Sequence, residues 1–127
     1  MKRIISLLLA LIGLLSGCGG TKMNNTYIQI TQEKAKQMMD EQKVLILDVR
    51  EQSEFDSGHI ANAVLLPLGS ITAETAAAVI PAKDTVVLVY CRSGNRSKTA
   101  SNALVELGYT NIYEFGGINT WPYGIVS

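Results

Sequence analysis

Two uninterrupted apolar runs, at residues 44–47 and 85–90, constrain the fold of this chain most. The first is bounded by charged residues, and the second is rich in β-branched side chains. Runs of this length, apolar at every position, are typical of strands covered on both faces in a parallel sheet. They predict that the centre of the fold is a buried, largely parallel sheet.

Shorter strand and helix patterns alternate around these two runs. Further strands are predicted at residues 27–30, 63–66 and 111–115, and helices at 31–41, 52–57, 70–80 and 97–107. Thr31 and Ser97 are the expected N-caps of the first and last of these helices. Such alternation predicts an α/β sandwich with a mostly parallel central sheet. Ligands of such sheets bind beyond the carboxyl ends of the strands, where Cys91 is expected.

Charge and composition exclude several classes of protein. Eleven basic and eleven acidic residues balance, and no basic patch stands out, which argues against a nucleic-acid partner. Cys18 and Cys91 are too few for a disulfide scaffold, and His59 is the single histidine, which is too little for a structural zinc site. We therefore expect no metal.

The N-terminus has the pattern of an export signal. Lys2 and Arg3 precede an apolar run at residues 4–15, which is too short to span a bilayer as a helix. The run ends in Leu-Ser-Gly-Cys, which resembles the lipobox of bacterial lipoproteins. That resemblance implies a signal peptide at residues 1–17, lipidation of Cys18, and a flexible linker through residue 26. A folded domain at 27–127 would then be anchored to a membrane of the bacterial cell envelope, outside the cytoplasm. The alternative is an ordinary signal peptide with an incidental cysteine.

The segment after the strongest strand carries the candidate chemistry. It reads as strand end, tight loop and helix start: Cys91, Arg92, Ser93, Gly94, Asn95, Arg96 and Ser97. If the loop curls around the sulfur, its backbone N–H groups form an anion-binding nest next to a helix N-terminus. Such a nest favours thiolate over thiol and would also bind an oxyanion. The alternative is that Cys91 is an inert core residue.

With this loop, the chain resembles the rhodanese-like family of sulfurtransferases. The resemblance covers nearly all of residues 27–121 and includes Leu-Asp-Val-Arg-Glu at 47–51, Glu-Phe at 54–55, Gly-His-Ile at 58–60, Pro-Leu at 67–68, the Cys91 loop, and Gly-Gly at 116–117 before Trp121. It implies a three-layer α/β/α sandwich without a cofactor. It also implies that Cys91 takes the outer sulfur of thiosulfate, expels sulfite, and passes the sulfur from a persulfide to cyanide or a thiol acceptor. Arg92 to Ser97 would bind the substrate.

Loop length separates this pattern from that of the cysteine-dependent phosphatases. Those enzymes place five residues between cysteine and arginine, whereas four residues separate Cys91 from Arg96 here. Ser97 occupies the position of the phosphatase arginine. The shorter loop favours a persulfide sulfur over a phosphate.

Several side chains have two interpretations. Arg96 is expected to face the substrate, whereas Arg92 either does the same or points into solvent. Asp48 and Arg50 either support the active loop or form a plain ion pair. His59 is expected to anchor a turn and Trp121 to pack in the core or at its rim. For the whole domain, the alternatives to an enzyme are a persulfide carrier or sensor without turnover, and a non-catalytic binding module.

Overall fold

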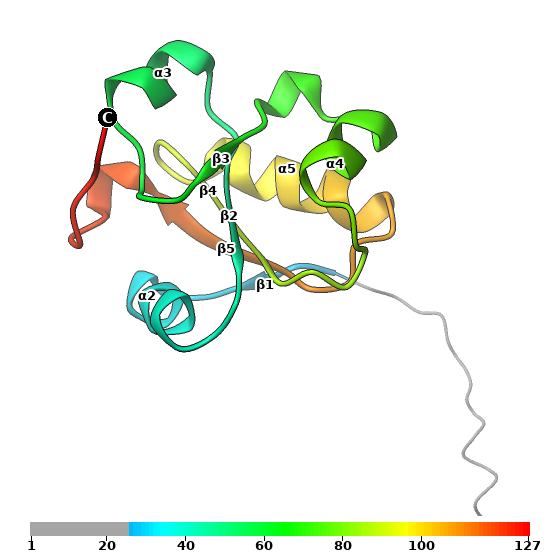
Figure 1. Cartoon of the computed structure of the whole chain (residues 1–127), viewed down its shortest axis with the longest axis horizontal. Helices are drawn as coiled ribbons and strands as arrows, with labels where there is room; N and C mark the ends of the chain where they lie inside the picture. Colours follow the sequence, from blue (N-terminus) through cyan, green and yellow to red (C-terminus); the bar gives the residue numbers. More distant parts are fainter. Residues whose placement is uncertain (1–25) are drawn as a thin grey trace, which may run out of the picture.

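The computed structural model describes residues 26–127, which form a five-stranded sheet with helices on both faces (Figure 1). The strand order is β1-β5-β4-β2-β3, and every pair of these neighbours is parallel. The strands are β1 (Ile28–Gln29), β2 (Leu45–Asp48), β3 (Val64–Leu65), β4 (Val87–Cys91) and β5 (Ile112–Gly117). The expected α/β class is confirmed, and the sheet of the described part is parallel throughout.

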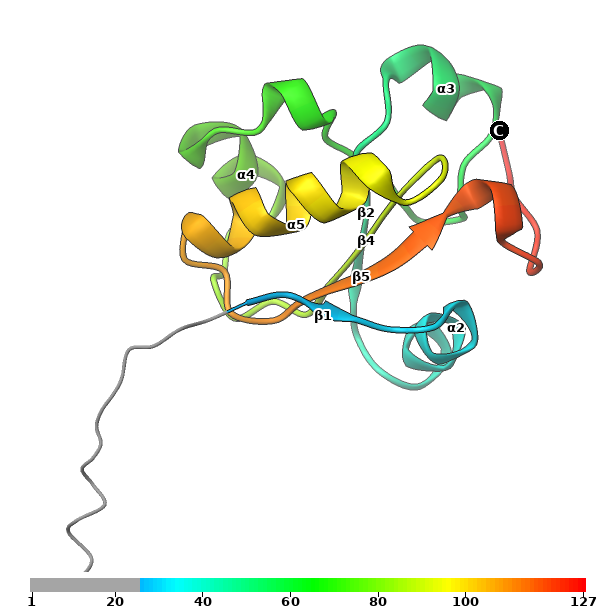
Figure 2. The same cartoon turned by 180° about the vertical axis from the view of Figure 1, so that it is seen from behind.

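The helices divide between the two faces of this sheet, as both views show (Figures 1 and 2). Helix α2 (Gln32–Glu41) covers one face, and α4 (Ala73–Val79) and α5 (Asn95–Glu106) cover the other. Helix α3 (Gln52–Ser57) follows β2 and lies near the C-terminus of the chain. Two 3-10 turns, η1 (Leu68–Ser70) and η2 (Ile118–Thr120), complete the fold. The three-layer arrangement is therefore confirmed.

Alternate residues of the central strands supply two separate cores. Val87 and Val89 of β4 pack with Ala100 and Leu104 of α5, whereas Leu88 packs on the α2 side. All five residues of β4 are buried. Strand β4 therefore holds Cys91 at the end of the most enclosed element of the fold.

Most predicted elements occur close to their expected positions, and two helix starts differ. Thr31 caps α2, its hydroxyl accepting from the Lys34 N–H at 3.0 Å. Helix α4 begins at Ala73 rather than at residue 70, because η1 forms a separate turn and Thr72 supplies the cap. Helix α5 begins at Asn95, two residues before the expected cap at Ser97. The prediction that Ser97 is an N-cap is wrong, and its buried hydroxyl is used elsewhere.

Within residues 26–127, no helix is both long enough and apolar enough to cross a membrane. The predicted signal peptide, the lipidated Cys18 and nearly all of the predicted linker lie outside the described residues.

Candidate active site

Cys91 ends β4 at the carboxyl edge of the sheet, between β2 and β5. Its side chain is 1% exposed, and its backbone pairs with Gly117 of β5. Position and burial together place a single thiol where parallel sheets bind their ligands. It is the only free cysteine among the described residues.

The loop after Cys91 curls back over the sulfur. Gly94 adopts a φ of +107°, in the left-handed region that favours glycine, and its N–H donates to the Cys91 Sγ at 3.1 Å. Helix α5 begins at the next residue, so its N-terminal end also faces this sulfur. The expected curl of the loop is present in the structure.

Strand β5 lies directly against this loop. A Cβ atom added to Gly117 would come within 2.0 Å of the Arg92 carbonyl oxygen and 2.6 Å of the Ser93 Cα. The Arg92 carbonyl also accepts from the Asn119 N–H at 3.1 Å. Only a residue without a side chain permits this close approach, so Gly117 lets β5 support the loop from below.

Opposing effects act on the Cys91 thiol. Burial raises its pKa, whereas a hydrogen bond with the Ser97 hydroxyl and hydrogen bonds from the N–H groups of Ser97, Gly94 and Ser93 lower it. The hydrogen bonds dominate, and the pKa of Cys91 lies below its ordinary value. Such a thiol is more readily ionised, and therefore more nucleophilic at neutral pH, than a free cysteine.

The two loop arginines differ in their surroundings. Arg92 is exposed. Arg96 forms a two-pronged ion pair with Glu54 of α3, its Nη1 and Nη2 lying 2.8 and 3.0 Å from the two carboxylate oxygens. This hydrogen bond is the main reason that the pKa of Glu54 falls to about 2. The Arg96 guanidinium is therefore bound to Glu54 of α3. Glu54 is the main cause that raises the pKa of Arg96, and the charge of Cys91 adds to the rise.

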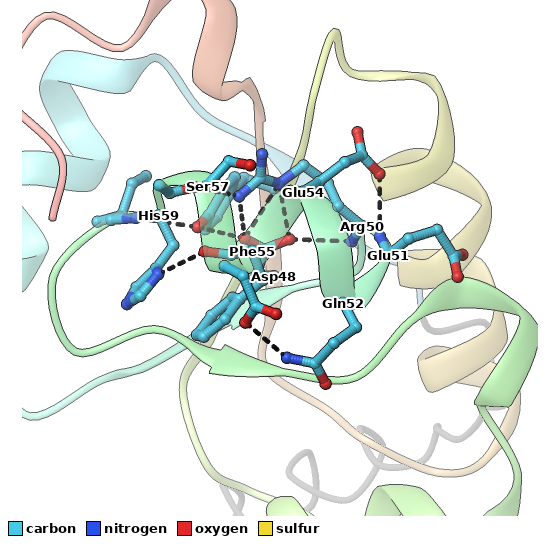
Figure 3. A network of polar contacts seen from close by, with 12 residues as sticks. Asp48, Arg50, Glu51, Gln52, Glu54, Phe55, Ser57 and His59 are labelled. Atoms are coloured by element: carbon cyan, nitrogen blue, oxygen red, sulfur yellow. Dashed lines mark hydrogen bonds and ion pairs between the residues drawn. The ribbon is translucent and has the colours of Figure 1, made fainter. Parts of the chain in front are cut away.

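Asp48 is the last residue of β2, the strand next to β4, and forms a buried ion pair with Arg50 (Figure 3). The Arg50 Nη2 lies 2.8 Å from the Asp48 Oδ2 and also donates to the Gly58 carbonyl at 2.7 Å. The Tyr90 hydroxyl donates to the same Asp48 oxygen at 2.6 Å and accepts from the Ile60 N–H. The pair therefore ties β2 and the turn after α3 to Tyr90, the residue before Cys91.

Asp48 and Arg50 pair with each other, at 2.8 Å between the Arg50 Nη2 and the Asp48 Oδ2. Burial alone lowers the pKa of Arg50, but the hydrogen bond and charge of Asp48 raise it above its ordinary value. Within the described chain, neither side chain forms a hydrogen bond to residues 92–97. Their link to the site is the Tyr90 hydroxyl, which donates to Asp48, and Tyr90 directly precedes Cys91.

His59 and Trp121 also lie where structural roles were expected. The His59 Nδ1 is 2.9 Å from the Phe55 carbonyl oxygen, and its ring stacks on Phe55 with centroids 3.8 Å apart (Figure 3). Its backbone pairs with Val126, which joins the C-terminal segment to this turn. Trp121 packs against Phe115 in the core on the α2 side.

Two carboxylates of the site were not identified from the sequence. Glu54, on α3, partners Arg96. Glu114, in β5, is 1% exposed and lies 2.5 Å from the Ser97 hydroxyl, which in turn lies 3.4 Å from the Cys91 sulfur. A signal for Glu114 was available, because it is a charged residue within a strand pattern that is otherwise largely apolar. Glu54 belongs to the Glu-Phe motif of the family resemblance, but nothing in the sequence identifies Arg96 as its partner.

The arrangement combines a nucleophile with an anion-binding loop. The same N–H groups that stabilise a thiolate would also hold a negatively charged sulfur or oxygen of a substrate. In the part of the chain that the structure describes, no three His, Cys, Asp or Glu side chains gather to bind a metal ion. The chemistry supported by this geometry is nucleophilic attack by sulfur.

Comparisons with known proteins point to the same chemistry. The family model described as "Rhodanese-like domain" matches residues 31–122. "Thiosulfate sulfurtransferase GlpE" of Coxiella burnetii is 34% identical over 96 residues, which cover 75% of this chain and 87% of that protein. "Thiosulfate sulfurtransferase PspE" of Escherichia coli K12 is 36% identical over 72 residues, or 57% and 68% of the two chains.

A solved structure agrees with these matches. It is described as "rhodanese with anions from E. coli" and superimposes with a TM-score of 0.62 at 30% identity. The match covers 67% of this chain and 99% of that one.

Proposed function

The chain belongs to the rhodanese-like domain family, and from this premise we propose that it is a sulfurtransferase that carries sulfur as a persulfide on Cys91. The observation that carries the proposal is the Cys91 sulfur itself, at the end of β4 with the Gly94 N–H 3.1 Å away. The donor is thiosulfate or a similar small anion, in keeping with the names of the relatives.

In the first half-reaction, the Cys91 thiolate attacks the outer sulfur of thiosulfate. A new S–S bond forms, the S–S bond of thiosulfate breaks, and sulfite leaves with the bonding electron pair. The negative charge that began on Cys91 then resides on the outer sulfur of the persulfide. The N–H groups of Ser93, Gly94 and Ser97 lower the pKa of Cys91 and would also stabilise this charge.

In the second half-reaction, cyanide or a thiolate attacks the outer sulfur and releases Cys91 as thiolate. The acceptor comes from outside, because residues 26–127 hold no second thiol to resolve the persulfide and the thiol of Cys18 would be blocked by the lipid expected there. Neither half-reaction requires a cofactor.

Turnover with thiosulfate and cyanide tests this proposal. The wild-type chain should release sulfite and thiocyanate continuously, and Cys91→Ser should abolish both. Cys18→Ser removes the other cysteine and is the matched control, which should retain turnover. Sulfur loading without turnover across several acceptors would instead identify a carrier or sensor. Failure of the wild-type chain to load sulfur would identify a binding module.

We also propose that the domain is held at a membrane of the bacterial envelope, outside the cytoplasm, by a lipid on Cys18. The support is the sequence pattern of residues 1–18 alone. Cys18→Ala should release the protein from the membrane fraction or block its processing. Unchanged membrane fractionation would refute the lipid anchor.

A further inference from the structure

A buried carboxylate lies behind the Cys91 thiol, and the proposed reaction does not use it. Glu114 stands opposite Val89 of β4, on the face of β5 that α5 covers. Its Oε2 accepts from the Gly116 N–H at 3.0 Å, and its Oε1 accepts from the Gln29 Nε2 at 3.2 Å. With 1% of its surface exposed, the carboxylate is held in place by the protein rather than by water.

One hydroxyl group stands between this carboxylate and the sulfur. The Ser97 Oγ is 2.5 Å from the Glu114 Oε2 and 3.4 Å from the Cys91 Sγ. A serine hydroxyl has a single hydrogen and can donate to only one of them at a time. The shorter contact, to a carboxylate, is the stronger, so Ser97 donates to Glu114 and the thiol of Cys91 donates to Ser97.

We propose that Glu114 is a positioning residue that holds the Ser97 hydrogen and thereby restrains the ionisation of Cys91. When the thiol loses its proton, two anions face one hydroxyl hydrogen, and one of them is left without that donor. The carboxylate thus opposes the loop N–H groups, which favour the thiolate. The reactivity of Cys91 is set by the balance between the two.

Loading with sulfur would remove this conflict, a step that rests on the proposed function. In the persulfide, the Sγ of Cys91 is uncharged, and the negative charge lies on the outer sulfur, one bond farther from Ser97. Ser97 can then donate its hydrogen to Glu114, because the Cys91 Sγ no longer carries a charge that needs this donor. Glu114 therefore disfavours the free thiolate more than the persulfide and biases Cys91 toward the loaded state.

Most other charged groups near Glu114 and Cys91 have partners of their own. Arg96 of α5 pairs with Glu54 of α3, and Asp48 pairs with Arg50 beside β2. Lys98 of α5 lines the same surface cavity as Glu114. From β1, the facing group is Gln29, which is uncharged. Among the carboxylates of the described chain, Glu114 is the one joined to the thiol by a shared hydroxyl.

The test is the pH dependence of Cys91 alkylation by iodoacetamide in the full chain, followed on the peptide that contains Cys91. Glu114→Gln keeps the shape of the side chain but removes its charge. The substitution should lower the apparent midpoint of the alkylation curve by about one pH unit. At a pH below both midpoints, the variant would then have about ten times more thiolate than the wild type. Glu114→Asp, which withdraws the carboxylate from Ser97, should shift the midpoint in the same direction and serves if the glutamine variant does not fold.

Two comparisons separate this mechanism from a general effect of charge. Glu106→Gln removes an exposed carboxylate from the end of α5, the helix that contains Ser97, and should leave the midpoint of Cys91 alkylation unchanged. When Ser97→Ala is already present, Glu114→Gln should shift the midpoint less than half as far. An unchanged or raised midpoint in both Glu114 variants, or a full shift without the Ser97 hydroxyl, would overturn the proposal. Because alkylation needs no thiosulfate, this result is independent of whether the chain transfers sulfur.

Discussion

Backbone groups, more than arginine side chains, supply the positive environment at Cys91. Burial raises the pKa of the thiol, and the N–H groups of Ser97, Gly94 and Ser93, with the Ser97 hydroxyl, lower it further than burial raises it. Arg92 is exposed, and the Arg96 guanidinium is paired with Glu54. An amide donor is fixed by the fold and needs no reorganisation when an anion arrives, which suits it to this task.

Arg96 should therefore act on substrate capture more than on the reaction of the sulfur. We expect Arg96→Ala to raise the KM for thiosulfate about three- to tenfold, which corresponds to the net contribution of one ordinary hydrogen bond, about 0.5–1.5 kcal/mol. The kcat should change much less. Lys34→Ala, which removes an exposed cation from α2, is the matched control. An unchanged KM in the Arg96 variant would show that Arg96 does not bind the substrate.

The loop at residues 92–97 depends on the close packing of strand β5 against it. The pairing of β4 with β5 shifts register between Val89 and Cys91, so β5 has one more residue than β4 over this stretch. Gly117 lies after this irregularity and against the Arg92 carbonyl. At Arg92 and Ser93 the loop therefore rests on the backbone of β5.

A methyl group at this position should displace the loop. In Gly117→Ala, the added Cβ would overlap the Arg92 carbonyl oxygen. We expect a loss of about 1–3 kcal/mol in the free energy of unfolding and a larger fractional loss of turnover. Gly69→Ala is the control, because nothing lies within 4 Å of its added Cβ. Denaturant unfolding and the sulfite assay measure both effects; equal behaviour of the two variants would contradict this role for Gly117.

The ion pair between Glu54 and Arg96 joins α3 to α5 and makes the stability of the whole domain depend on pH. The pKa of Glu54 falls from 4.5 to about 2 in the folded chain, chiefly through the hydrogen bond from Arg96. A carboxyl with a depressed pKa stabilises the fold above its unfolded pKa, and this contribution is lost as the pH falls toward the folded value.

Glu54→Gln should therefore cost stability at neutral pH and much less in acid. Because the pair is partly exposed, with side chains 33% and 28% accessible, we expect a loss of only about 0.5–1 kcal/mol at pH 7. The difference from wild type should shrink as the pH falls from about 4.5 toward 2. Urea unfolding of both proteins across this pH range measures the difference in their free energies of unfolding. A difference that does not change with pH would show that the ion pair is not the cause of the lost stability.

The sequence was informative wherever a signal was local. Apolar runs located β2 and β4, and residues 52–57 form α3 as expected. Ser97 was misassigned as a cap, because a serine before a helical pattern suits both a cap and a buried hydroxyl. The partnerships of Glu54 and Glu114 could not be read from the sequence, since they join residues 42 and 17 positions apart that only the fold brings together.

The intact mass of the chain before and after incubation with thiosulfate tests most directly whether Cys91 carries sulfur. Cys91, with its lowered pKa and its ring of N–H donors, should gain one sulfur atom, and an equal amount of sulfite should appear in solution. The gain should be absent in Cys91→Ser and should disappear from the wild-type chain when cyanide is added. An unchanged wild-type mass, or an equal gain in Cys91→Ser, would contradict the assignment of Cys91 as the sulfur carrier.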